Sequence, residues 1–215
     1  MSRSRQTHMN HRLWRGEVLI MWARILLCSA VLAGCTAAEP PASEALYFER
    51  LSALCNGEAY AGTLVSTDAV DADFQSADMR MGPATCDGNT ILIPFAVGED
   101  RSRTWVITRT VDGVRLKHDH RHRDGTEDAV TQYGGDSDNT GSIGAQDFPA
   151  DDETKELFVR EGLDVSIQNT WRVEIAPGEQ FTYQMSRPER MFRVEFDLTQ
   201  PVEAPPPTWG ASPIE

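Results

Sequence analysis

Apolar and polar residues alternate with a period of two over much of the chain, the pattern typical of β-strands with one buried face. In the C-terminal third the alternation covers Trp171–Ile175, Phe181–Met185 and Phe192–Leu198. Residues 176–178 (Ala-Pro-Gly) and 187–189 (Arg-Pro-Glu) separate these runs and are turn sequences. We therefore predict a three-strand antiparallel meander here, buried on one side.

Further strands and two short helices are predicted upstream of this meander. Apolar residues recur at helical spacing over Glu44–Leu54, and Asp152–Glu161 is a second short helix candidate. The other predicted strands are Tyr60–Ser66, Met79–Cys86, Thr90–Val97, Arg103–Val111, Val114–His122 and Ala129–Tyr133. About nine short strands in sequence order favour a mainly β fold, a single antiparallel meander closed or nearly closed into a barrel; a curled sandwich is the alternative.

The N-terminal region has the features of an export signal. Ile25–Gly34 is apolar, follows Arg24, and is far shorter than the roughly 20 residues that a membrane-spanning helix needs. The four residues that end it, Leu32-Ala33-Gly34-Cys35, resemble the lipobox of bacterial lipoproteins. This resemblance implies cleavage before Cys35 and a membrane anchor of lipid on that cysteine; an ordinary secretory leader is the alternative. Thr36 after the cysteine favours the outer membrane, facing the periplasm, over the inner membrane.

The chain accordingly divides into four parts. Residues 1–34 are predicted to be a lipoprotein signal peptide, residues 35–44 a tether, residues 45–200 the β-barrel-like domain and residues 201–215 a Pro-rich tail, extended or disordered. In an exported chain whose Cys35 carries lipid, Cys55 and Cys86 are expected to form a disulfide. A redox or metal pair is the alternative, although the C-x-x-C spacing is missing.

Two further resemblances concern the domain itself. A helix followed by Gly57-Glu58-Ala59-Tyr60-Ala61-Gly62 resembles the start of lipocalin-type barrels, which implies a lipocalin-like barrel. The stretch Leu116–Gly135 is similar to uncharacterised secreted proteins of proteobacteria, and that similarity implies no function.

Charge and motifs exclude some functions and weaken others. The chain has a formal net charge of −13, and removal of residues 1–34 leaves 15 basic and 32 acidic residues, a net charge of −17. So acidic a domain repels phosphate backbones, which argues against nucleic-acid binding. G-x-S-x-G, H-E-x-x-H and glycine-rich phosphate loops are all missing from the sequence, which weakens the hypothesis of an enzyme without excluding it.

The three histidines downstream of Cys35 lie at alternate positions of one predicted strand, His118, His120 and His122. The dipeptide Asp112-Gly113 predicts a two-residue hairpin loop. In that register Ile107 lies opposite His118, Trp105 opposite His120 and Arg103 opposite His122. Opposed residues share a face, so the histidines, Arg109 and Val111 are predicted to lie on the inner face of the sheet.

A second hairpin is predicted at Asp124-Gly125. It places Glu127 opposite His122, Thr131 opposite His118 and Tyr133 opposite Leu116. Imidazole, carboxylate, phenol and indole groups then form one polar patch at the end of an apolar interior.

Several hypotheses for this patch remain open. In the first, Trp105, His118, His120, His122 and Tyr133 line a cavity that binds a small molecule. In the second, His118, His120, His122 and Glu127 supply ligands to a metal ion, in a binding protein or a metal-dependent hydrolase. In the third, these are polar residues at a barrel mouth, the interior is filled by side chains, and the protein serves as a structural or interaction protein of the cell envelope. No particular cofactor is indicated.

Overall fold

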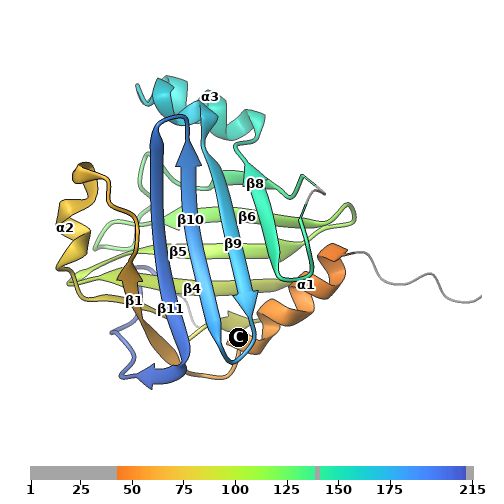
Figure 1. Ribbon diagram of the computed structural model, residues 1–215. Helices are drawn as coiled ribbons and strands as arrows, with labels where there is room; N and C mark the ends of the chain where they lie inside the picture. The colour runs from red at the N-terminus through yellow and green to blue at the C-terminus, as the bar shows by residue number, and fades with distance from the viewer. Residues whose placement is uncertain (1–42, 139–140, 212–215) are drawn as a thin grey trace, which may run out of the picture. The chain divides into compact units, whose positions relative to one another are not determined.

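The strands form one antiparallel sheet that winds into a nearly closed barrel (Figure 1). The computed structural model describes residues 43–138 and 141–211. The sheet order is β7-β6-β5-β4-β2-β1-β11-β10-β9-β8, and β3 pairs with β4. The strands are β1 Ala59–Leu64, β2 Met79–Met81, β3 Thr85–Cys86, β4 Thr90–Val97, β5 Asp100–Arg109, β6 Val114–His120, β7 Tyr133–Asp136, β8 Ala145–Pro149, β9 Thr170–Ala176, β10 Gln180–Arg187 and β11 Arg190–Val202. Because nearly every strand pairs with its sequence neighbour and β1 pairs with β11, the predicted meander is confirmed.

The two edge strands of the sheet are β7 and β8, and the barrel nearly closes where they meet. The Asp151 amide donates to the Gly134 carbonyl at 2.9 Å, and the Asp138 amide donates to the Asp147 carbonyl at 3.3 Å. Thr154 of helix α3 (Asp152–Arg160) is buried here, and its hydroxyl bonds both the amide and the carbonyl of Gly134. A Cβ at Gly135 would overlap the Pro149 carbonyl, so glycine is what allows the strands to approach.

Helices cover both ends of the barrel. Helix α1 (Ser43–Leu51) and the 3₁₀ turn η1 (Ser52–Leu54) together cover the predicted helix, beginning one residue before it, and bury Tyr47, Phe48 and Leu51 in the main core. The Tyr47 hydroxyl donates to the Val173 carbonyl of β9 at 3.1 Å. At the other end lie α3, the 3₁₀ turn η3 (Asp164–Gln168), the 3₁₀ turn η2 (Ala69–Asp71) and helix α2 (Ala72–Gln75). In Figure 1 α1 and α3 occupy opposite ends of the front strands.

The disulfide between Cys55 and Cys86 is confirmed. It joins the chain just after η1 to strand β3. The N-terminal helix is thereby covalently attached to the sheet, in addition to its apolar packing.

Three predicted elements differ from the structure. The run Met79–Cys86 is two strands, β2 and β3, because Pro83 has no amide hydrogen for a continuous ladder. Of the predicted strand Ala129–Tyr133 only Tyr133 is in a strand, as the first residue of β7, where it pairs with His118 rather than with Leu116. The Thr131 hydroxyl accepts a hydrogen bond from the His120 amide at 2.8 Å, in place of a backbone carbonyl. Strand β8 was not predicted, because its five residues include Asp147 and end at Pro149.

The hairpin between β5 and β6 has a longer loop than predicted. Arg109 pairs with Val114, and the Thr110 amide donates to the Gly113 carbonyl at 2.9 Å. The register is therefore shifted by two residues, which preserves the face of every strand residue. Val111 is an exception, because it lies in the loop and is 100% exposed rather than on the inner face.

The Pro-rich tail packs against the barrel over its described part. Strand β11 continues to Val202, which pairs with Ala59, so the barrel extends past residue 200. Beyond it, the Trp209 amide donates to the Arg101 carbonyl at 3.0 Å, and the guanidinium of Arg123 lies 5.5 Å from the centre of the Trp209 ring. The stretch up to Ala211 is thus extended but held in place, which the sequence left open.

The predicted signal peptide, the lipidation site Cys35 and most of the tether lie outside the described residues. The tether prediction overlaps the structure at Ser43 and Glu44, which already belong to α1. Within residues 43–138 and 141–211, no helix is long and apolar enough to cross a membrane.

Candidate functional site

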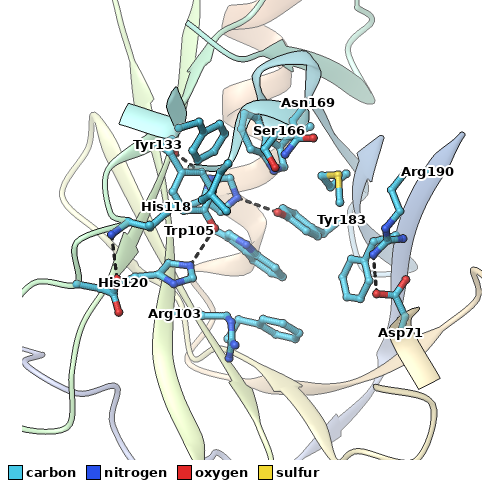
Figure 2. A pocket seen from close by; sticks show the side chains of 18 of the residues that line it. Asp71, Arg103, Trp105, His118, His120, Tyr133, Ser166, Asn169, Tyr183 and Arg190 are labelled. Atoms are coloured by element: carbon cyan, nitrogen blue, oxygen red, sulfur yellow. Dashed lines mark hydrogen bonds and ion pairs between the residues drawn. The ribbon is translucent and has the colours of Figure 1, made fainter. Parts of the chain in front are cut away.

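The barrel interior contains a cavity of about 380 Å³ at the end away from α1 (Figure 2). Its walls come from β4, β5, β6, β7, β9, β10 and β11, from the loop before β7, and from η2, α2, α3 and η3. Its lining includes Trp105, His118, His120 and Tyr133, four of the five residues predicted to bind a ligand. The volume lies within the range of small-molecule sites, roughly 300–1,000 Å³.

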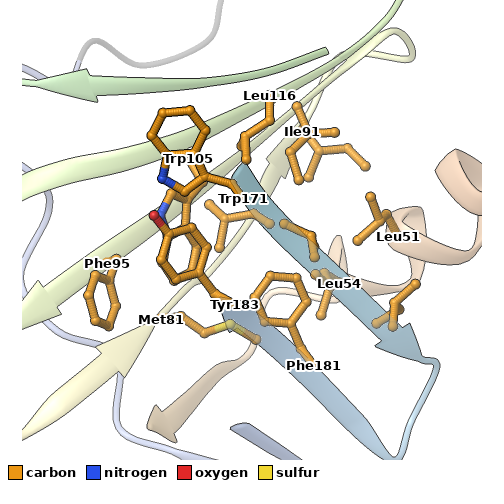
Figure 3. Close-up of a cluster of buried hydrophobic side chains, with 14 of the residues drawn as sticks. Leu51, Leu54, Met81, Ile91, Phe95, Trp105, Leu116, Trp171, Phe181 and Tyr183 are labelled. Carbon is orange, nitrogen blue, oxygen red and sulfur yellow. The ribbon is translucent and has the colours of Figure 1, made fainter. Parts of the chain in front are cut away.

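Stacked aromatic rings form one wall of the cavity. Trp105 lies between Phe95 and Tyr183, with ring centres 4.8 Å and 4.4 Å away and planes within 16° and 18° of parallel. Figure 3 shows these three side chains at the edge of the apolar core. Trp171 completes the wall near His118. Such a surface favours flat, apolar molecules.

His118 is a buried, fully hydrogen-bonded residue. It is 2% exposed and stacks on Tyr133 with ring centres 4.5 Å apart. Its Nδ1 lies 3.0 Å from the Tyr133 carbonyl, which only accepts, so Nδ1 carries the proton and donates. Its Nε2 then accepts from the Tyr183 hydroxyl at 2.8 Å. Burial lowers the pKa of His118 to about 3, so the ring is neutral at pH 7.

His120 forms a second polar pair, with Tyr133. Its Nε2 lies 3.0 Å from the Tyr133 hydroxyl oxygen. Burial, reinforced by the positive charge of Arg103, lowers the pKa of His120 to about 4. Burial also raises the pKa of Tyr133. Both groups are therefore uncharged over the neutral pH range, and this pair is suited to hydrogen bonding rather than to ionic recognition.

The arginines at the cavity are paired with carboxylates. A guanidinium nitrogen of Arg103 lies 2.6 Å from Asp100. Arg190, at the opposite side of the cavity in Figure 2, lies 2.6 Å from Asp71 and 2.9 Å from Asp68. Their charges are thus balanced within the protein.

The structure does not bring the four predicted metal ligands together. Strand β6 ends at His120, and the side chain of His122 is 56% exposed in the turn that follows. Glu127 pairs with Arg121 at 3.5 Å, on the outer side, rather than with His122. Both nitrogens of His118 are already bonded within the protein. In the described part of the chain, no three His, Cys, Asp or Glu residues are grouped so that they could hold a metal ion.

Several lining residues were not predicted as site residues. Tyr183 and Met185 of β10 and Phe192 of β11 were placed on the buried face by their alternation, but the pattern does not distinguish a cavity wall from a filled core. Asp71 and Arg190 are 119 residues apart in sequence, and no local signal joins them. Ser166 and Asn169 reach the cavity only because η3 lies across the barrel end.

A second, larger hollow of about 640 Å³ lies between the Pro-rich tail and the outer face of β4 and β5. Its charged residues, Asp119 and Arg121, are 2.9 Å apart and satisfy each other. The inner cavity is the better candidate site, because it joins aromatic walls to hydrogen-bonding groups inside the barrel.

Comparison with known proteins adds no assignment: no family model, no curated protein and no solved structure matches the chain.

Proposed function

We propose that this protein is a lipid-anchored cell-envelope protein that binds a small, largely apolar molecule inside its barrel. The observation that carries the proposal is the cavity of about 380 Å³, with stacked aromatic rings on one side and neutral polar groups on another. The cavity is open to solvent, so a small molecule can enter it, and its lining combines aromatic rings with hydrogen-bonding groups, as small-molecule sites do. The cavity therefore supports a binding role over a structural one.

Binding is tested by titration with N-phenyl-1-naphthylamine, a neutral probe whose fluorescence rises in apolar surroundings. The full chain carrying Cys35→Ser is suited to this experiment, because it cannot take up lipid at that position. Ser166 of η3 lines the cavity, so the larger side chain of Ser166→Trp is expected to fill it. The dissociation constant of the probe is then expected to rise about tenfold or more, a loss of about 1.4 kcal/mol of binding free energy.

Val165→Trp is the matched control. Val165 precedes Ser166 in the same turn and is 66% exposed, so its replacement is expected to leave the affinity unchanged. Absence of saturable binding, or an equal loss in both variants, would contradict a ligand site in the barrel.

The anchor on Cys35 is tested separately, in cells of a Gram-negative bacterium. The wild-type chain is expected to incorporate radiolabelled palmitate and to sediment with outer membranes. Cys35→Ser is expected to lose both properties, whereas Cys28→Ser in the same leader retains them. Palmitate incorporation into Cys35→Ser would disprove the anchor without affecting the cavity.

A further inference from the structure

The charged side chains that line the cavity leave no arginine free. They are Asp71, Arg103, Asp128 and Arg190. Both arginines are held by carboxylates, at 2.6 Å in each case. Asp128 accepts a hydrogen bond from the Val130 amide at 2.9 Å and lies 3.8 Å from Nδ1 of His122. An anionic ligand would therefore enter without a free counter-charge, and burying an unpaired charge is costly.

The two histidines of the cavity do not supply that charge. His118 uses both ring nitrogens within the protein, on the Tyr133 carbonyl and the Tyr183 hydroxyl. His120 is bonded through Nε2 alone among the contacts of the described residues. A group that approaches its Nδ1 therefore meets a neutral imidazole.

The His120–Tyr133 pair can adopt two hydrogen-bonding arrangements across the same 3.0 Å contact. When the Tyr133 hydroxyl donates to Nε2, Nδ1–H is left as a donor and the phenolic oxygen as an acceptor. When Nε2–H donates to the phenolic oxygen, Nδ1 is left as an acceptor and the phenolic hydrogen as a donor. In both arrangements the pair offers one donor and one acceptor, which suits a hydroxyl or a carbonyl group.

We propose that the ligand is an uncharged aromatic compound bearing a hydroxyl or carbonyl group, which hydrogen-bonds to the His120–Tyr133 pair while its rings lie against the wall of Trp105 and Tyr183. This inference rests on the proposed function and adds the chemical class of the ligand. Carboxylates, fatty acids among them, are the class that it excludes.

Displacement of N-phenyl-1-naphthylamine by matched naphthalenes tests the inference on the Cys35→Ser chain at pH 7. The competitors are 2-naphthol, 2-naphthoate and 2-naphthylmethylammonium, which share one ring system and differ in charge. We expect 2-naphthol to displace the probe at a concentration at least about tenfold lower than either ion. The carboxylate of 2-naphthoate would bury an unpaired charge, and an ammonium group donates hydrogen bonds but accepts none from the His120–Tyr133 pair. Equal or better displacement by either ion would overturn the inference.

Two further measurements locate the effect. Naphthalene, which lacks the hydroxyl group, is expected to displace the probe less well than 2-naphthol does. His120→Phe keeps a ring but removes the hydrogen-bonding nitrogens, so it is expected to abolish this difference between the two competitors while the variant still binds the probe. An undiminished advantage in this variant would contradict the role of the pair; Tyr133→Phe provides the same comparison if His120→Phe does not fold. If an ion displaces the probe best and Ser166→Trp prevents probe binding, only the ligand class is wrong; if the probe itself does not bind, the proposed function is wrong.

Discussion

Replacement of both Cys55 and Cys86 by serine is expected to lower the free energy of unfolding by about 3.7 kcal/mol, the value for a loop of this length in the chain-entropy model. The two residues are 31 apart in sequence, so the crosslink removes many conformations from the unfolded chain. Both side chains belong to exposed residues, and serine therefore creates no cavity. Urea unfolding of the oxidised wild type and of the double variant measures the difference.

A reducing agent provides the internal control for this experiment. It is expected to bring the wild type to the stability of the double variant and to leave the double variant unchanged. Since the disulfide attaches the chain just after η1 to β3, its removal leaves α1 held by apolar packing and by the Tyr47–Val173 hydrogen bond. We therefore expect α1 to be the first element to lose protection from hydrogen exchange. Coincident unfolding curves for oxidised wild type and double variant would show that the crosslink contributes nothing.

Acidification from pH 7 to pH 4.5 is expected to destabilise the protein by about 3 kcal/mol through His118 alone, at about 1.36 kcal/mol per pH unit below the ordinary histidine value. Burial lowers the pKa of this ring from 6.5 to about 3, so the unfolded chain binds more protons than the folded protein between these values. The contribution of the neutral His118 ring to the free energy of unfolding is complete above pH 6.5 and is lost as the pH falls toward 3. His120, with its pKa lowered to about 4, acts in the same direction.

His118→Gln and His122→Gln distinguish this effect from general acid denaturation. Glutamine at position 118 does not titrate, so the loss of stability between pH 6.5 and 4.5 is expected to become smaller by about 3 kcal/mol. His122 is 56% exposed, and its replacement is expected to leave the pH dependence as in the wild type. Equal slopes in all three proteins, measured by urea unfolding at several pH values, would refute the role of His118.

The hypotheses of a metal site and of a ligand cavity at the histidines make different demands on the structure. A metal site requires ring nitrogens that are free and convergent, whereas His118 is saturated by Tyr133 and Tyr183 and His122 points away. A ligand cavity requires space, aromatic surface and neutral hydrogen-bonding groups, which β5, β6 and β10 provide together. This difference in geometry is the reason that we propose an organic ligand, rather than a metal ion, for this site.

The local pattern of apolar and polar residues was sufficient to predict the main strands of this fold. Strand β4 spans the predicted residues Thr90–Val97, and β9 to β11 form the predicted meander. The inner positions of Trp105, His118 and His120 were also predicted, although the hairpin loop is longer than expected. That prediction held because side chains alternate with a period of two, so a register shift of two residues leaves each on its face.

The sequence by itself predicted most of the strands and their buried faces, because these depend on alternation along the chain, and it favoured a disulfide between Cys55 and Cys86 over a redox or metal pair. Only the tertiary structure decided that Tyr183 bonds His118, that Arg190 meets Asp71, and that η3 covers an unfilled interior. These contacts join residues tens of positions apart, and they depend on how far the sheet curls and where its last strands stop. The alternation of side chains along a strand carries no information about the curl of the sheet or about where its last strands end. Whether the interior contains a cavity therefore depended on the tertiary structure.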